Sequence, residues 1–264
     1  MKKKNIVSKI YTALLLLFLY LPIGVLIFYS FNDGKTTVWK GFTLKWYAEL
    51  LNDSAIMGSL YNTLIIAFLA SVAATVLGTA AAIGISNFKG AKRAIIQNAS
   101  NIPIINPEIV TGVSLMLMFT LLGVAFSFEM GFWTVLLAHI SFCTPYVILS
   151  VMPRIRQMDK NVYEAALDLG CNQWQAFTKV VIHEIMPGIF SGFLLSFTYS
   201  LDDFVITYFT RGSKFQTLPI QIYTMTHKRI SPKINALSAL LFVTIMVIMI
   251  AINVRNRKAA KTKA

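Results

Sequence analysis

Six long apolar runs constrain this 264-residue chain more than any other feature of its sequence. Each has roughly 20 residues or more, the length with which an α-helix crosses the hydrocarbon core of a bilayer. They are Ile10–Phe31, Gly58–Ser86, Ile104–Phe126, Phe132–Met152, Ile185–Phe209 and Ile234–Val254. Backbone polar groups in lipid must be hydrogen-bonded within the segment, so the runs are predicted to be helices.

The composition supports a membrane protein. The chain is 56% hydrophobic and 13% charged, whereas about a quarter of the residues of a soluble domain are charged. We therefore set a soluble enzyme aside and predict an all-α, polytopic membrane protein with one transmembrane domain over residues 1–264. The first run follows a basic N-terminus, as a signal peptide would, but it is too long for one and no cleavage site follows.

The positions of the basic residues predict an orientation. All 24 Lys and Arg fall outside the six runs. With both termini in the cytoplasm, sixteen of them lie inside and eight outside, which agrees with the positive-inside rule. This distribution favours a membrane over a nucleic acid as the partner of a chain with a formal charge of +13.

A polar-faced segment, residues 153–184, interrupts the apolar runs and lies in the cytoplasm under this orientation. Asn161 is a plausible cap for a first short helix, and Gly170 can end it in a left-handed conformation. A second helix would carry Trp174 and Phe177 on one face. The apolar residues at helical spacing in the first helix are Val162, Ala165, Ala166 and Leu169. Such a hairpin can lie on lipid headgroups or dock into the groove of a partner protein.

The pattern of Glu164-Ala165-Ala166, then Gly170, then Val180 resembles the EAA loop of ABC importer permeases. His183 stands where that family has a proline. The resemblance implies the type I permease fold, with this loop as a coupling-helix hairpin that inserts into a cytoplasmic ATPase. Glu164 would contact the ATPase, and we take Trp174 and Phe177 as candidate apolar anchors because aromatic residues dominate interface energies.

The same resemblance implies the other components. Two permease chains would form the pore, a pair of ABC ATPases would bind ATP and Mg²⁺, and an extracytoplasmic binding protein would deliver the solute across a bacterial cytoplasmic membrane. This chain is expected to need no cofactor and to catalyse no reaction. Its nearest approach to a phosphate-binding loop, Gly34-Lys35-Thr36, has Tyr29 where the motif needs glycine. Its three histidines lack metal-ligand spacing.

Three further stretches resemble spermidine/putrescine permeases, in particular the second of two related permease subunits. They are Asn106-Pro107-Glu108-Ile109-Val110, His139-Ile140-Ser141-Phe142-Cys143-Thr144-Pro145 and Leu195-Ser196-Phe197-Thr198-Tyr199-Ser200-Leu201-Asp202-Asp203. The resemblance implies uptake of a polyamine.

Two adjacent acids in the fifth run independently favour a cationic solute. A charge near the bilayer centre costs about 2.5–3.5 kcal/mol, so Asp202 and Asp203 need a reason. A predicted polar stripe comprises Ser196, Tyr199, Ser200, Asp203 and Thr207. It favours Asp203 for the substrate path. Asp202 is also a candidate for the path, and the alternatives for it are that it faces a neighbouring helix or is protonated. The alternative is that the carboxylate pairs with a basic residue of the partner subunit.

Glu108 is a further candidate for the path. The alternative is that it lies at a helix N-terminus, where the dipole favours an acid. Tyr199 is the one aromatic side chain that we assign to the path, since its ring offers a cation–π surface. Two other functions remain open at this stage. One is the same family with a different solute, and the other is a cation-coupled secondary transporter, whose acids would carry coupling ions.

Overall fold

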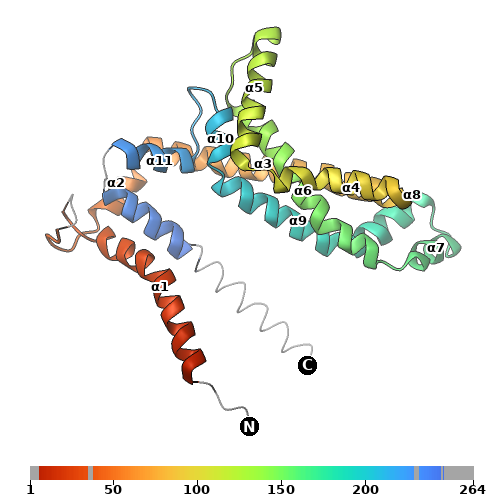
Figure 1. Cartoon of the computed structure of the whole chain (residues 1–264), viewed down its shortest axis with the longest axis horizontal. Coiled ribbons are helices and arrows are strands. Elements are labelled where there is room, and N and C mark those ends of the chain that lie inside the picture. The colour runs from red at the N-terminus through yellow and green to blue at the C-terminus, as the bar shows by residue number, and fades with distance from the viewer. Residues whose placement is uncertain (1–5, 35–37, 229–231, 245, 247–264) are drawn as a thin grey trace. The chain divides into compact units, whose positions relative to one another are not determined.

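The computed structural model describes residues 6–34, 38–228, 232–244 and 246, and most of these residues are helical (Figure 1). Within them, five helices are long and apolar enough to cross a membrane. These are α1 (Ile6–Ser30), α3 (Ser54–Asn87), α5 (Glu108–Phe126), α6 (Phe132–Gln157) and a helix from Gln173 to Asp202. The sixth predicted run forms a helix over Pro232–Thr244, and its residues 247–254 lie outside the described part. The predicted all-helical membrane fold is confirmed.

The chain divides into two compact units, residues 1–58 with 221–264 and residues 59–220. In the first unit, polar contacts organise the segment between α1 and α2 (Lys45–Leu51). The Trp46 indole N–H donates to the Asn32 carbonyl at 2.7 Å. The Lys233 ammonium lies 3.4 Å from carboxylates of both Glu49 and Asp53. These contacts fix the connections of this unit and leave its long helix α1 exposed along its length.

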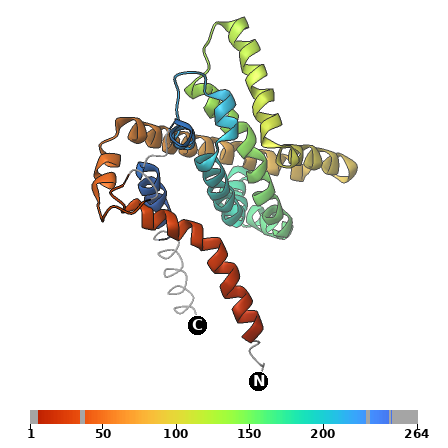
Figure 2. The same ribbon diagram turned by 60° about the vertical axis from the view of Figure 1, so that its left-hand side comes forward.

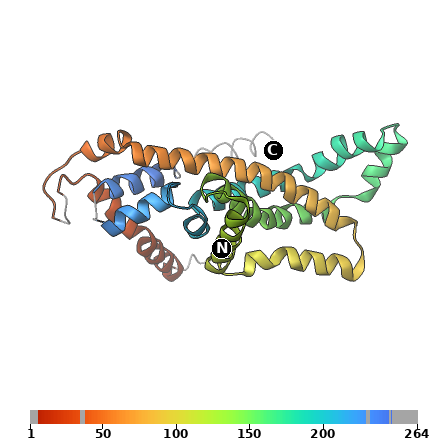
Figure 3. The ribbon, with the colours of Figure 1, turned by 90° about the horizontal axis from the view of Figure 1, so that it is seen from above.

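The second unit is built on α6 and α9 (Ile182–Asp202), which lie side by side (Figure 1), with α3 running along them (Figure 3). Glycines permit this close approach. A Cβ added at Gly78 of α3 would lie 2.6 Å from Cβ of Val147, and one added at Gly192 of α9 would lie 3.2 Å from Cα of Val147. Small residues at such contacts are typical of helix packing in membranes, where van der Waals contact replaces the hydrophobic effect.

The third predicted run, Ile104–Phe126, is not one helix. A helix that the sequence analysis did not predict, α4 (Gly90–Ile105), precedes α5, and the two run in different directions from their junction (Figure 2). Asn106 is extended, with φ −71° and ψ 135°. The residue before a proline is disfavoured in the helical region, so Pro107 ends α4 and Glu108 opens α5.

The fifth predicted run, Ile185–Phe209, is also broken. Helix α9 ends at Asp202, Asp203 is extended with φ −61° and ψ 125°, and α10 (Val205–Thr210) follows. The Asp203 carboxylate accepts hydrogen bonds from the backbone N–H groups of Ile206 and Thr207, at 3.2 and 2.8 Å. Side chains of Asp favour the start of a helix for this reason. The prediction of one continuous polar stripe from Ser196 to Thr207 was therefore wrong.

The polar-faced segment, residues 153–184, contains α7 (Lys160–Asp168) and α8 (Gln173–Ala176). Helix α8 passes through a π-helical segment, η1 (Phe177–Val181), into α9. The first predicted short helix is thus present, but the second is the beginning of a long helix rather than a separate one. The predicted cap was also wrong by two residues. Asp159, not Asn161, caps α7, since its carboxylate accepts from the Asn161 N–H at 3.0 Å.

Candidate functional site

The turn between α7 and α8 is fixed by its backbone. Gly170 has φ +90°, a left-handed conformation that glycine adopts without steric cost. Its N–H donates to the Leu167 carbonyl at 2.9 Å and the Cys171 N–H donates to the Ala166 carbonyl at 3.1 Å. This is the Schellman arrangement, which satisfies the last carbonyls of a helix. On the other side of the turn, the Asn172 side-chain oxygen accepts from the Gln175 backbone N–H at 2.8 Å. The Gln175 side-chain oxygen accepts from the Asn172 backbone N–H at 3.2 Å, and this pair of hydrogen bonds starts α8.

The hairpin exposes apolar side chains although it is otherwise polar. Leu169 is 86% exposed and Trp174 is 72% exposed. The Trp174 ring lies 6.0 Å from the ring of Phe177, which is partly buried. Within the motif, Glu164 and Ala165 are exposed while Ala166 is buried. The structure thus brings the predicted coupling residues together on one short hairpin, with an acid and a large aromatic residue on its surface.

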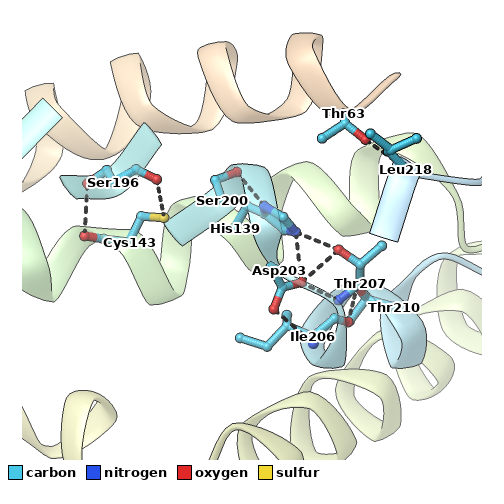
Figure 4. A network of polar contacts seen from close by, with 10 residues as sticks. All are labelled: Thr63, His139, Cys143, Ser196, Ser200, Asp203, Ile206, Thr207, Thr210 and Leu218. Carbon is cyan, nitrogen blue, oxygen red and sulfur yellow. Dashed lines mark hydrogen bonds and ion pairs between the residues drawn. The ribbon is translucent and has the colours of Figure 1, made fainter. Parts of the chain in front are cut away.

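A buried polar network lies at the far end of α6 and α9 from the hairpin (Figure 4). Its centre is His139 of α6, whose side chain is 1% exposed, and Asp203, whose side chain is 5% exposed. The His139 Nε2 atom lies 3.4 Å from a carboxylate oxygen of Asp203 and 2.9 Å from the Thr207 hydroxyl. Its Nδ1 atom lies 2.6 Å from the Ser200 hydroxyl. One imidazole therefore connects α6, α9 and α10.

The hydrogen bonds assign the protons of this network. The Thr207 hydroxyl lies 2.7 Å from the Asp203 carboxylate and donates its proton there. A hydroxyl has a single proton, so the same oxygen accepts from His139, and Nε2 must carry a hydrogen. The Ser200 hydroxyl can then donate to Nδ1.

The two adjacent acids differ in exposure, and the structure corrects their predicted assignment. Asp203, predicted to face the path, is turned into the chain against His139. Asp202, for which contact with a neighbouring helix was one alternative, is exposed. The reason is the break after α9: Asp203 is used to start α10, so the side chains after residue 202 no longer follow the helical register of α9.

Tyr199, one of the four predicted path residues, belongs to an aromatic pair. Tyr199, which is 41% exposed, stacks on Tyr146 of α6 with ring centroids 4.3 Å apart. Asp202 follows Tyr199 by three residues, on the same side of α9. Glu108 is exposed in the first turn of α5, so its predicted place at a helix N-terminus is confirmed.

The helix break after Asp202 lies beside the start of α5. A Cβ added at Gly112, one turn after Glu108, would lie 3.5 Å from the Val205 carbonyl oxygen and 2.8 Å from the Phe209 ring. We use the name acid–aromatic cluster for Glu108, Tyr146, Tyr199 and Asp202. Glu108 follows the break between α4 and α5, Asp202 precedes the break between α9 and α10, and Tyr199 of α9 stacks on Tyr146 of α6.

Sequence reasoning missed His139 and Tyr146. His139 carried a usable signal, since an ionisable residue within an apolar run is unusual and is expected to have a partner. Tyr146 carried none, because the chain contains ten tyrosines and only the packing of α6 against α9 selects this one.

Comparison with known proteins identifies the family. Residues 74–257 match the family described as binding-protein-dependent transport system inner membrane component. The chain is 34% identical over 245 residues to the spermidine/putrescine transport system permease protein PotC of Escherichia coli, covering 92% of this chain and 91% of that protein. It is 40% identical over 230 residues to the putrescine transport system permease protein PotI of the same species, covering 85% and 81%.

Solved structures agree on the fold. A bacterial ABC transporter involved in the import of the acidic polysaccharide alginate matches with a TM-score of 0.69 at 16% identity, covering 97% of this chain and 98% of that chain. An amino acid ABC transporter matches with a TM-score of 0.54 at 18% identity, covering 81% and 100%. The chain belongs to the binding-protein-dependent transport system inner membrane components, and it is a multi-pass permease subunit of an ABC importer.

Proposed function

We propose that this permease subunit forms half of a transmembrane pathway for a polyamine such as spermidine or putrescine. The names of its relatives PotC and PotI support this solute class. The observation that carries the proposal is the exposed Asp202 carboxylate, three residues after Tyr199, whose ring stacks on Tyr146. An ammonium group gains a charge-assisted hydrogen bond from such an acid and a cation–π contact from such rings.

The geometry also supports different roles for the three carboxylates. Asp203 is occupied by its own chain, which leaves Asp202 and Glu108 as the acids available to a cation in the acid–aromatic cluster. A polyamine carries several ammonium groups along a flexible chain, so separated acids are suited to it. A related permease chain would supply the other half of the pathway.

The remaining components follow from the transport mechanism of an ABC importer. We propose that a pair of cytoplasmic ATPases binds ATP and Mg²⁺, that this chain binds neither, and that an extracytoplasmic binding protein delivers the solute. ATP binding would favour one pore conformation, and release would favour the other conformation. The surface formed by Glu164, Leu169 and Trp174 is the proposed contact with an ATPase, because large exposed apolar side chains on a polar hairpin are suited to a protein groove.

Both termini are proposed to be cytoplasmic. Basic residues in the proposed outer segments contradict this orientation at first sight. However, Lys214 lies 3.6 Å from Glu129, and Lys233 lies 3.4 Å from Glu49 and Asp53. These acidic partners also belong to proposed outer segments. Both members of each pair therefore lie on the same side of the membrane under this orientation, and the acids reduce the net positive charge of the outer side.

The test is uptake of radiolabelled spermidine and putrescine by the complete transporter carrying Asp202→Asn. This change keeps the shape of the side chain and removes its charge. A charge-assisted hydrogen bond contributes about 1.5–3 kcal/mol, so KM should rise roughly ten- to hundredfold at equal membrane levels. The matched control is Asp33→Asn, an exposed acid of the other unit that pairs with Lys45. Equal uptake by Asp202→Asn and the control would reject the proposed cation contact.

A further inference from the structure

The buried pair of His139 and Asp203 has no direct place in a cation path, because its polar atoms already have partners. One carboxylate oxygen of Asp203 accepts from the Ile206 N–H at 3.2 Å. The other accepts from the Thr207 N–H at 2.8 Å and the Thr207 hydroxyl at 2.7 Å, and lies 3.4 Å from His139 Nε2. Three hydrogen bonds within the chain, together with a side chain that is only 5% exposed, leave this carboxylate little access to a solute.

The position of this network suggests what it does instead. His139 lies on α6, Ser200 is the residue after Tyr199 on α9, and Thr207 lies on α10. The imidazole therefore joins the last turn of α9 to the first turn of α10, across the extended residue that separates them. Asp202 lies directly between these attachments. The direction in which the Asp202 side chain points therefore depends on the backbone conformation of the break between α9 and α10.

We propose that His139 and Asp203 are positioning residues for transport: they hold the break between α9 and α10 so that Asp202 and Tyr199 face the solute. This inference rests on the proposed cation contact at Asp202. It assigns the two adjacent acids different tasks, one internal and one directed at the solute. It also assigns a role to His139, which would otherwise be an unexplained buried imidazole.

The first test compares Asp203→Asn with Asp203→Ala in the complete transporter. Asparagine starts helices about as well as aspartate, and its carbonyl oxygen can accept from Thr207. If Asp203 acts by position, Asp203→Asn should stay within about threefold of the wild-type KM for spermidine. Asp203→Ala loses the cap and should raise KM by about tenfold. Equal impairment of both variants would show that the charge itself is needed, and would overturn the proposal.

The second test separates positioning from a merely structural role. If Asp203 acts through Asp202, then Asp203→Ala should add little to the KM of Asp202→Asn, because the contact is already lost. A general loss of folding would instead lower the maximal rate and the amount of protein in the membrane, and would add to the effect of Asp202→Asn. Additive effects on KM would reject the proposal.

A further pair of variants covers failure of Asp203→Ala to reach the membrane. His139→Gln retains a donor that can reach Asp203 or Thr207, whereas His139→Leu retains volume but no polar atom. The proposal expects His139→Gln to keep most of the uptake and His139→Leu to raise KM. Equal KM values for the two would overturn it. These experiments also separate the two proposals. If Asp202→Asn has no effect on uptake, the proposed cation contact is rejected. The comparison of Asp203→Asn with Asp203→Ala still shows whether Asp203 acts as a cap.

Discussion

The two ends of the α6–α9 pair differ in which side chains they expose and which they bury. At the hairpin, in a segment of mostly polar residues, Leu169 and Trp174 face outward. At the other end, among apolar helices, His139 and Asp203 face inward and are almost fully buried. Each region therefore contains residues whose exposure is the reverse of what their polarity favours.

The reversal has a different cause in each region. Exposed apolar side chains on a hairpin gain free energy only when another molecule covers them, so that surface indicates a partner protein. A buried carboxylate and imidazole are stable only when hydrogen bonds replace water, and the network of Figure 4 supplies them within the chain. The proposed role of the hairpin requires a partner outside the chain, whereas the hydrogen bonds of the network lie within it. Variants at the two ends should fail in correspondingly different ways.

The largest effect at the hairpin is expected from Gly170→Val. Its φ of +90° is strained for a β-branched residue by about 1–3 kcal/mol, and the turn that orients α7 against α8 would change. Uptake should fall by roughly two orders of magnitude, together with co-purification of the ATPase, at unchanged membrane levels. Gly84→Val is the matched control, because Gly84 is exposed and a Cβ there meets nothing within 4 Å. Loss of uptake with intact ATPase binding would contradict a docking role.

A smaller effect is expected from Trp174→Ala. Interface tryptophans often contribute about 2 kcal/mol or more, so affinity for the ATPase should fall about thirtyfold, measured by titrating ATPase against reconstituted permease. Thermal stability of the permease should not change, since the side chain is 72% exposed. Trp133 is also 72% exposed, at the opposite end of α6, and Trp133→Ala should leave the affinity unaltered. The same loss from both variants would mean that Trp174 is no specific anchor.

The smallest effect on uptake is expected from single cysteines that report the side of the membrane. Asp168→Cys and Asn52→Cys alter exposed residues and should transport normally in a background with Cys171→Ser. A membrane-impermeant thiol reagent should label position 168 only from the cytoplasm and position 52 only from outside. Labelling of both positions from one side would remove the proposed orientation, and the hairpin could not then meet a cytoplasmic ATPase.

Much of the fold was predictable because it depends on local pattern. Helices of membrane-spanning length follow from apolar runs, since lipid leaves the backbone no other partner. The hairpin followed from its amphipathic spacing and Gly170. The break after Ile105 was also encoded locally, because Pro107 disfavours a helical Asn106, although the sequence analysis did not use that signal.

The sequence by itself determined that this chain crosses a membrane, carries an amphipathic hairpin, and holds two adjacent acids in an apolar segment. Only the tertiary structure decided which acid is available. Asp202 and Asp203 are chemically identical neighbours, and helical periodicity favoured Asp203. The choice depends on His139, which is 64 positions earlier in the sequence and meets Asp203 only when α6 packs against α9. A carboxylate that finds buried donors turns inward, because their hydrogen bonds replace those of water, and its neighbour is left to face outward.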